Sequence, residues 1–183
     1  IHHRLVAFRR SREFFDGDRN FGYGGFAYDG RWQPIAKGIC QNYGIEAGHK
    51  VLQINSEKGF LLHDLKSACA GLEVFGSETS EYAIENSMDN VRDCIHRALP
   101  DALPFPDSHF DFIIGLGVVY IQTLEGAVQV LKEIQRTGKG ASFVTLAAYE
   151  TEEDYFLFRD WTLLGALILK KEEWREVLEY SGY

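Results

Sequence analysis

Short apolar segments alternate with amphipathic segments along most of this chain. Apolar side chains recur at helical spacing between the candidate strands, for example from Leu124 to Ile134. Strand and helix alternate five times, which favours a mostly parallel sheet covered by helices on both faces. We predict strands at 50–54, 72–76, 94–97, 110–116 and 142–148, and helices at 59–69, from 80 towards 91, at 124–138, from 151 towards 161 and at 171–180.

Length and composition set the class of protein. The chain has 183 residues, enough for one domain with its own core, and 45% of them are hydrophobic. A net charge of −8 disfavours nucleic acid or an anionic membrane as the main partner. Arg4, Arg9, Arg10 and Arg12 form one basic cluster, which we expect to be a solvated N-terminal face. The three cysteines follow no disulfide or metal pattern, and no signal peptide or spanning run is seen, which predicts a cytoplasmic protein.

The turn after the first predicted strand has the layout of a nucleotide cofactor site. The strand runs into a turn and a helix over residues 51–61, and Glu78 closes the second strand. Such a turn is normally glycine-rich, because the backbone must bend tightly and let a ligand approach. Here Asn55 and Glu57 replace the ligand-side glycines, and only Gly59, the glycine that serves helix packing, is present. Glu57 also places a negative charge near a helix N-terminus, which would repel a cofactor carboxylate.

Several segments, in their order and spacing, resemble class I S-adenosylmethionine-dependent methyltransferases of the bacterial small-molecule type, with a degenerate cofactor motif. The resemblance covers nearly the whole chain and implies a Rossmann-like class I methyltransferase fold, with S-adenosylmethionine as the cofactor. Residues 1–45 then form an aromatic and glycine-rich cap with a helix, and residues 46–183 form the Rossmann-like domain, without the C-terminal strands of the usual seven-stranded sheet. The segments that carry the resemblance are 11–32, 51–61, 74–80, 103–107, 109–113 and 131–140.

The resemblance also implies which residues would contact the cofactor. Gln53 stands where the family has an acidic residue for the methionine amino group, and Leu99 stands where it has an adenine-contacting Asp. Glu78 keeps its acidic character and can hold ribose hydroxyls. The replacements would each cost on the order of 1–3 kcal/mol of binding free energy, which predicts weak or lost cofactor binding. The full set of cofactor positions is Gln53, Asn55, Glu57, Gly59, Glu78, Thr79 and Leu99.

A glycine- and aromatic-rich stretch at 21–32 is the second candidate site. It suits either a lid over a pocket or an arm held to the sheet by buried aromatic rings. The candidate substrate-binding residues are Tyr23, Tyr28, Arg31 and Tyr120. Arg31 would clamp an anionic group, and Tyr120 would either orient an acceptor or pack against the following helix. No catalytic residue or metal site is assigned, because methyl transfer depends mainly on alignment of the acceptor.

Two functions remain open from the sequence. The first is a methyltransferase-like pseudoenzyme with weak or lost methyl transfer, acting as a structural or regulatory partner of another protein, such as an active paralogue. The second is an active methyltransferase on a small, anionic metabolite or a sugar.

Overall fold

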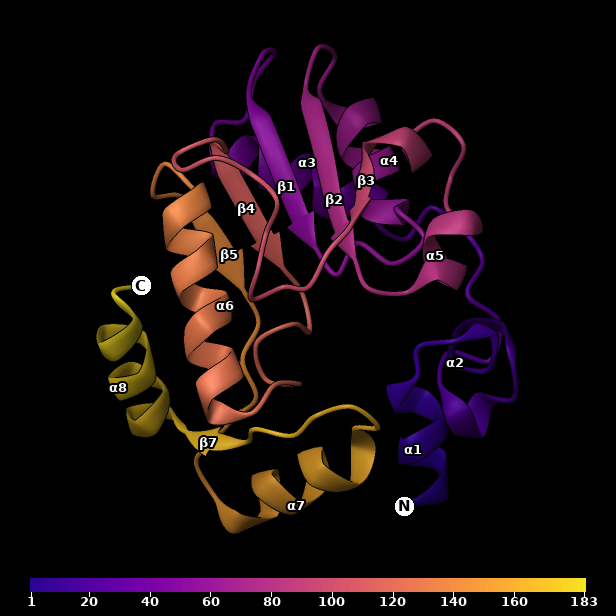
Figure 1. Ribbon diagram of the computed structural model, residues 1–183, viewed down its shortest axis with the longest axis vertical. Coiled ribbons are helices and arrows are strands. Elements are labelled where there is room, and N and C mark those ends of the chain that lie inside the picture. Colours follow the sequence, from indigo (N-terminus) through magenta and orange to yellow (C-terminus); the bar gives the residue numbers. More distant parts are fainter.

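The computed structural model describes residues 1–183, and its centre is a five-stranded parallel sheet (Figure 1). The strand order is β3-β2-β1-β4-β5, so the order reverses between β1 and β4. Ligands of such sheets bind beyond the carboxyl ends of the strands at this reversal. The predicted α/β fold is confirmed. The strands are β1 (Lys50–Ile54), β2 (Glu73–Glu78), β3 (Ile95–Arg97), β4 (Phe112–Gly115) and β5 (Ser142–Val144).

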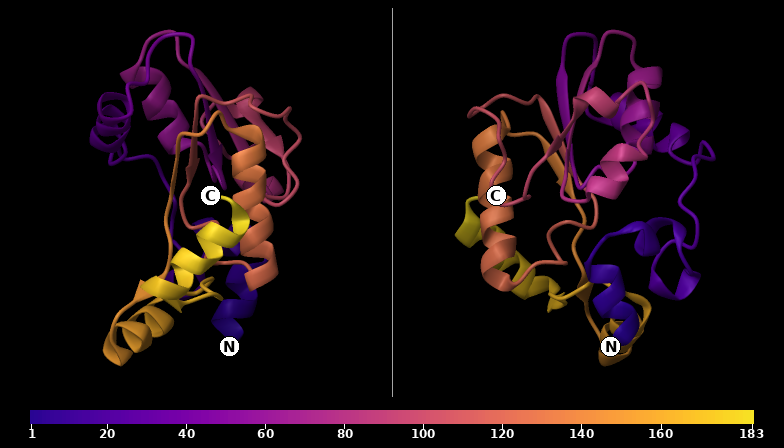
Figure 2. Two further views of the ribbon diagram at one scale, coloured as in Figure 1. Left: turned by 90° about the vertical axis from the view of Figure 1, so that its left-hand side faces the viewer. Right: turned by 45° about the vertical axis from the view of Figure 1, so that its right-hand side comes forward.

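Helices cover both faces of this sheet, as the left view of Figure 2 shows. Leu52 and Ile54 of β1 pack towards α6 (Leu124–Thr137) and α8 (Lys171–Ser181). Val51 lies on the opposite face, in a second core with α3 (Gln33–Asn42) and α4 (Phe60–Ala68). This division follows from the two-residue alternation of side chains along a strand. The short helix α5 (Glu81–Glu85) follows β2, and a 3-10 turn (Arg92–Cys94) precedes β3.

The N-terminal segment lies beyond the carboxyl ends of the strands, near α7 (Figure 1). Arg4 of the N-terminal segment contacts the chain that follows α7, since its guanidinium donates to the carbonyl oxygens of Leu163 (3.1 Å) and Gly165 (2.6 Å). The elements of this region are α1 (His2–Phe8), α2 (Arg12–Asp16), a 3-10 turn (Arg19–Phe21), α7 (Glu152–Trp161) and a separate two-stranded sheet of β6 (Ala148–Tyr149) and β7 (Leu169–Lys170).

Three elements are shorter than the sequence pattern indicates. The strand predicted at 110–116 covers only Phe112–Gly115. The helix capped by Ser80 ends at Glu85, because the backbone N–H of Met88 donates to Lys58 O (3.0 Å) instead of continuing the helix. The fifth strand ends at Val144. The backbone N–H of the next residue, Thr145, still donates to Gly115 O (3.1 Å), and its hydroxyl accepts from Gly117 N–H (2.8 Å). None of the helices is long and apolar enough to cross a membrane, and the three cysteines are unpaired.

Candidate functional site

The loop between β1 and α4 has the backbone of a glycine-rich turn, although two of its positions carry side chains. Asn55, Glu57 and Gly59 all have left-handed backbones, with φ of 58°, 53° and 73°. Residues with a Cβ rarely adopt this conformation, and Asn tolerates it better than Glu. A Cβ on Gly59 would lie 2.8 Å from Val91 Cγ2, so this glycine is needed for close packing of the helix. This agrees with the packing role predicted for it.

Glu78 lies at the end of β2, and donors from the chain itself surround its carboxylate. Oε1 accepts from the backbone N–H groups of Thr79 (2.8 Å) and Ser80 (2.9 Å), and Oε2 accepts from that of Glu57 (2.8 Å). Arg10 Nη2 lies 3.2 and 3.0 Å from the two oxygens. The Glu78 side chain is fully buried. Neither carboxylate oxygen is therefore open to a ligand.

Arg10 reaches this carboxylate from the N-terminal segment. Its guanidinium carbon lies 5.5 Å from the ring centroids of Phe14 and Phe15, a separation typical of cation–π contacts. Only 12% of its side chain is exposed, so the expectation that Arg10 belongs to a solvated basic face is wrong. Burial is tolerated because Glu78 supplies the opposite charge and the two rings cover the guanidinium.

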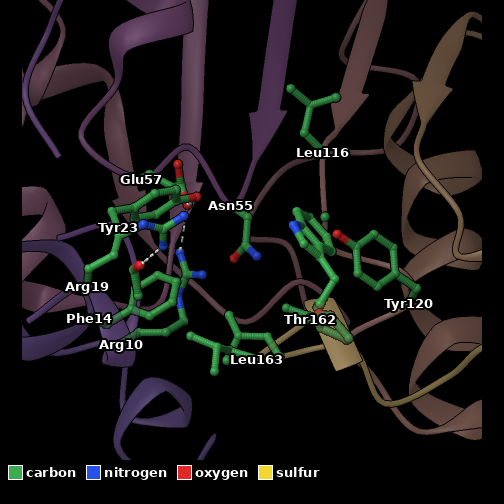
Figure 3. Close-up of a pocket in the computed structure, with 15 residues that line it drawn as sticks. Arg10, Phe14, Arg19, Tyr23, Asn55, Glu57, Leu116, Tyr120, Thr162 and Leu163 are labelled. Atoms are coloured by element: carbon green, nitrogen blue, oxygen red, sulfur yellow. Dashed lines mark hydrogen bonds and ion pairs between the residues drawn. The ribbon is translucent and has the colours of Figure 1, made fainter. Parts of the chain in front are cut away.

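Glu57 joins the same polar group. Tyr23 OH donates to Glu57 Oε1 at 2.6 Å, and Arg10 Nη2 lies 4.0 Å from that oxygen. Burial raises the pKa of Glu57 to about 7, although Arg10 and Tyr23 act in the opposite direction. The shift places the titration of this carboxyl near neutral pH instead of in the acid range. Figure 3 shows Arg10, Tyr23 and Glu57 gathered on one side of the site, and the Asn55 amide pointing into the space between them and Tyr120.

A second ion pair holds the N-terminal segment to the loop. Lys58 Nζ donates to both oxygens of Asp16 (2.9 and 2.6 Å) and to the carbonyl oxygen of Phe26 (2.9 Å). Phe26 stacks on Phe60 at the start of α4, with ring centroids 4.8 Å apart. Of the two interpretations of residues 21–32, these contacts favour the arm packed on the domain.

The β4 side of the loop is hollow. A cavity of about 790 Å³ lies between α3 and the carboxyl ends of β1, β4 and β5. Gln53 and Asn55 are part of its wall and are only 5% and 7% exposed. A smaller cavity of about 210 Å³ shares Asn55, Glu57 and Tyr120 and extends to Arg10 and Arg19 (Figure 3). The aromatic residues of the larger cavity are Tyr23, Trp32, Tyr43, Tyr120, Phe143, Phe158 and Trp161.

Comparison with known proteins places this geometry in a family. Residues 40–145, more than half of the chain, match the family model described as "Methyltransferase domain". The chain belongs to this methyltransferase family. The class I S-adenosylmethionine-dependent methyltransferase family inferred from the sequence is therefore confirmed. No curated protein matched the sequence.

Solved structures share the fold of this methyltransferase domain. The methyltransferase in a complex with the Haloferax volcanii Trm112 methyltransferase activator is 20% identical, with 83% of this chain and 76% of that chain covered and a TM-score of 0.64. YcgJ from Bacillus subtilis is 17% identical, with coverages of 81% and 68% and a TM-score of 0.66. The [4+2]-cyclase SpnF is 16% identical, with coverages of 81% and 57% and a TM-score of 0.65. At these identities the likeness shows the fold.

The structure brings together some of the predicted site residues of this methyltransferase domain and separates others. Five of them line the larger cavity: Tyr23, Gln53, Asn55, Glu57 and Tyr120. The Thr79 N–H donates to Glu78, and Gly59 packs against the core.

The remaining predicted residues lie outside this cavity. Leu99 is 60% exposed after β3. Tyr28 OH donates to Asp64 (2.6 Å), and Arg31 pairs with Asp29 (2.6 Å). Arg31 is therefore already paired within its own loop.

Several residues of the site were not identified from the sequence, among them Arg10, Asp16 and Trp161. Arg10 lies in an arginine-rich run and Asp16 near the end of α2, and neither position has a motif. Trp161 is the last residue of the helix that the capping box at Thr151 predicts. A large aromatic side chain at that helix end is the one feature of the sequence that could have indicated its place in the site.

Proposed function

We propose that this methyltransferase domain has weak or lost methyl transfer and acts as a structural or regulatory partner of another protein. The observation that carries the proposal is the buried pair of Arg10 and Glu78. The family resemblance assigns Glu78 to the ribose hydroxyls of S-adenosylmethionine. In this chain the guanidinium of Arg10 takes the place of those hydroxyls on the Glu78 carboxylate.

The magnitudes favour the internal pair. Removal of one partner from a buried ion pair costs about 3–5 kcal/mol, because the other charge is left uncompensated. A hydroxyl hydrogen-bonded to a carboxylate returns about 1.5–3 kcal/mol. The Asn55 side chain also occupies space that a glycine would leave open, and Gln53 carries no charge for an ammonium group. The residues at these positions therefore do not fit S-adenosylmethionine in the family's usual manner.

A partner role has independent support in the surface of α7. Phe156, Leu157 and Trp161 are all exposed on this one helix. Several large apolar side chains left exposed on one short helix are compatible with a protein interaction site. The Haloferax volcanii structure of the same fold is a complex with a methyltransferase activator, which shows the fold in association with a protein. An active paralogue is the partner that we propose to test first.

The second candidate function is an active methyltransferase on a small anionic metabolite or a sugar. The smaller cavity favours it, because Arg10 and Arg19 line that cavity beside Tyr120, at the edge of the sheet where acceptors bind in this fold. Such an enzyme would need Arg10 to leave Glu78 when the cofactor enters.

Calorimetric titration of the protein with S-adenosylmethionine and S-adenosylhomocysteine separates the two functions. We expect no binding by the parent up to millimolar ligand. The triple variant Asn55→Gly, Glu57→Gly and Leu99→Asp, combined with Arg10→Met, should gain binding, whereas the triple variant with Arg9→Met, an exposed neighbour, should gain less. Micromolar binding by the parent would favour the active enzyme and would contradict the proposal.

A further inference from the structure

Gln53 is a buried amide without an internal partner. It is the second-last residue of β1 and is only 5% exposed. Its Oε1 accepts no hydrogen bond from the chain. Buried polar side-chain atoms are nearly always paired, so an orphaned amide in a cavity wall points to a group supplied from outside. Asn55, two residues further on, presents a second neutral amide to the same cavity.

The rest of this cavity offers little to a charged ligand. Glu57 is its only residue with a formal charge, and that carboxyl already accepts a hydrogen bond from Tyr23. No lysine or arginine lines it. A cation would find one weak counter-charge, and an anion would find none, while either would lose its hydration. The lining therefore favours an uncharged ligand.

Aromatic rings form one continuous wall of the cavity. The ring centroids of Tyr120 and Phe158 are 5.5 Å apart, and those of Phe158 and Trp161 are 5.6 Å apart. Aromatic faces bind flat rings through stacking and edge contacts. The volume of about 790 Å³ lies within the range of small-molecule sites.

We propose that this cavity binds an uncharged planar ligand whose lactam or amide edge pairs with Gln53, and whose ring lies against Tyr120, Phe158 and Trp161. A primary amide presents one acceptor and one donor side by side, so its natural complement is an N–H next to a C=O. The inference rests on the proposed function in one respect, because it takes the cavity as free of the methionine part of S-adenosylmethionine.

Two matched probes test this inference: 2-quinolinone, which has a lactam edge, and N-methyl-2-quinolinone, in which a methyl group blocks the N–H. Binding is followed by quenching of tryptophan fluorescence and by ligand-observed NMR. We expect the parent to bind 2-quinolinone about tenfold more tightly than the methylated probe, the size of one net hydrogen bond. Gln53→Leu should abolish this preference. Gln41→Leu, the same change at an exposed position on α3, should retain it.

The outcomes are distinct for the two proposals. Equal affinity of the parent for both probes, no binding of either, or an unchanged preference in a folded Gln53→Leu variant would overturn the amide subsite. Gln53→Asn gives a second test, because a shortened amide should weaken 2-quinolinone while the methylated probe is unaffected. Binding of S-adenosylmethionine by a parent that still prefers 2-quinolinone would overturn the proposed function and leave the subsite standing.

Discussion

The Glu78 carboxylate and the Gln53 amide, on the two sides of the loop at 55–59, differ in how their buried oxygens are paired. On the β2 side, the oxygens of Glu78 accept from Arg10 and from three backbone N–H groups. On the β4 side, the Oε1 of Gln53 has no partner. Glu78 is the last residue of β2 and Gln53 is the second-last residue of β1, and these two strands are parallel neighbours.

The difference separates a structural network from a binding wall. A polar group with all its partners inside the chain contributes to stability and has no capacity left for a ligand. A buried polar group without partners costs stability and is retained most readily where a ligand completes it. On the β2 side, Arg10 of the N-terminal segment therefore fills the binding capacity of the Glu78 carboxylate. On the β4 side, the Gln53 oxygen is left to pair with a ligand.

The largest expected effect is on the β2 side. Arg10→Met should lower the free energy of unfolding by about 3–5 kcal/mol, because Glu78 is left buried without its counter-charge. Urea denaturation measures this loss. Adding Glu78→Gln should recover part of it, since the uncompensated charge is then gone. A loss no larger than that of Arg9→Met would break the comparison.

The second ion pair should contribute less, because Asp16 is partly exposed. Asp16→Asn weakens the charged hydrogen bonds from Lys58, and we expect a loss of about 1–2 kcal/mol. Limited proteolysis should then cleave within residues 1–31 faster than in the parent, while the sheet domain persists. Asp18→Asn, an exposed neighbour, is the matched control and should leave the cleavage rate unchanged.

The pH dependence of stability tests Glu57. Its pKa is raised from near 4.5 to about 7, so the folded state binds the proton more tightly than the unfolded state. The stabilisation of the folded state by this proton is fully present below pH 4.5 and is lost as the pH rises through about 7. The total loss of stability is roughly 1–3 kcal/mol, because about a fifth of the side chain is in solvent. Because Gln cannot ionise, Glu57→Gln should be about as stable as the parent at pH 4.5 and should become more stable than the parent as the pH rises through about 7, and thermal unfolding measures this growing difference. A difference independent of pH would contradict the assignment.

The smallest effect is expected on the β4 side. Gln53→Leu removes an amide whose oxygen has no partner, so the free energy of unfolding should stay within about 0.5 kcal/mol of the parent or rise slightly. Urea denaturation alongside Arg10→Met gives the direct contrast. A loss of several kcal/mol would show that Gln53 has a structural role and would remove the difference between the two sides.

Local pattern predicted the elements, and long-range contacts decided the site. The strands, the packing role of Gly59 and the capping box at Thr151 follow from short-range patterns, and all are present. The pair of Arg10 and Glu78 joins residues 68 positions apart, and no spacing rule relates them. The amides of Gln53 and Asn55 were recognised as changes from the family pattern, but the cavity that makes them neighbours of Trp161 depends on packing among α3, α7 and three strands.

The left-handed backbone of Asn55 and Glu57 also bears on how such a site changes over time. These residues adopt the same conformation as Gly59, so the loop is shaped by the strand before it and the helix after it, and only secondarily by its own residues. A mutation to glycine at either position would shorten a side chain and leave the path of the chain in place. A few single-residue substitutions, each of which retains the fold, can therefore convert a loop whose side chains fill the site into a glycine loop that leaves the site open.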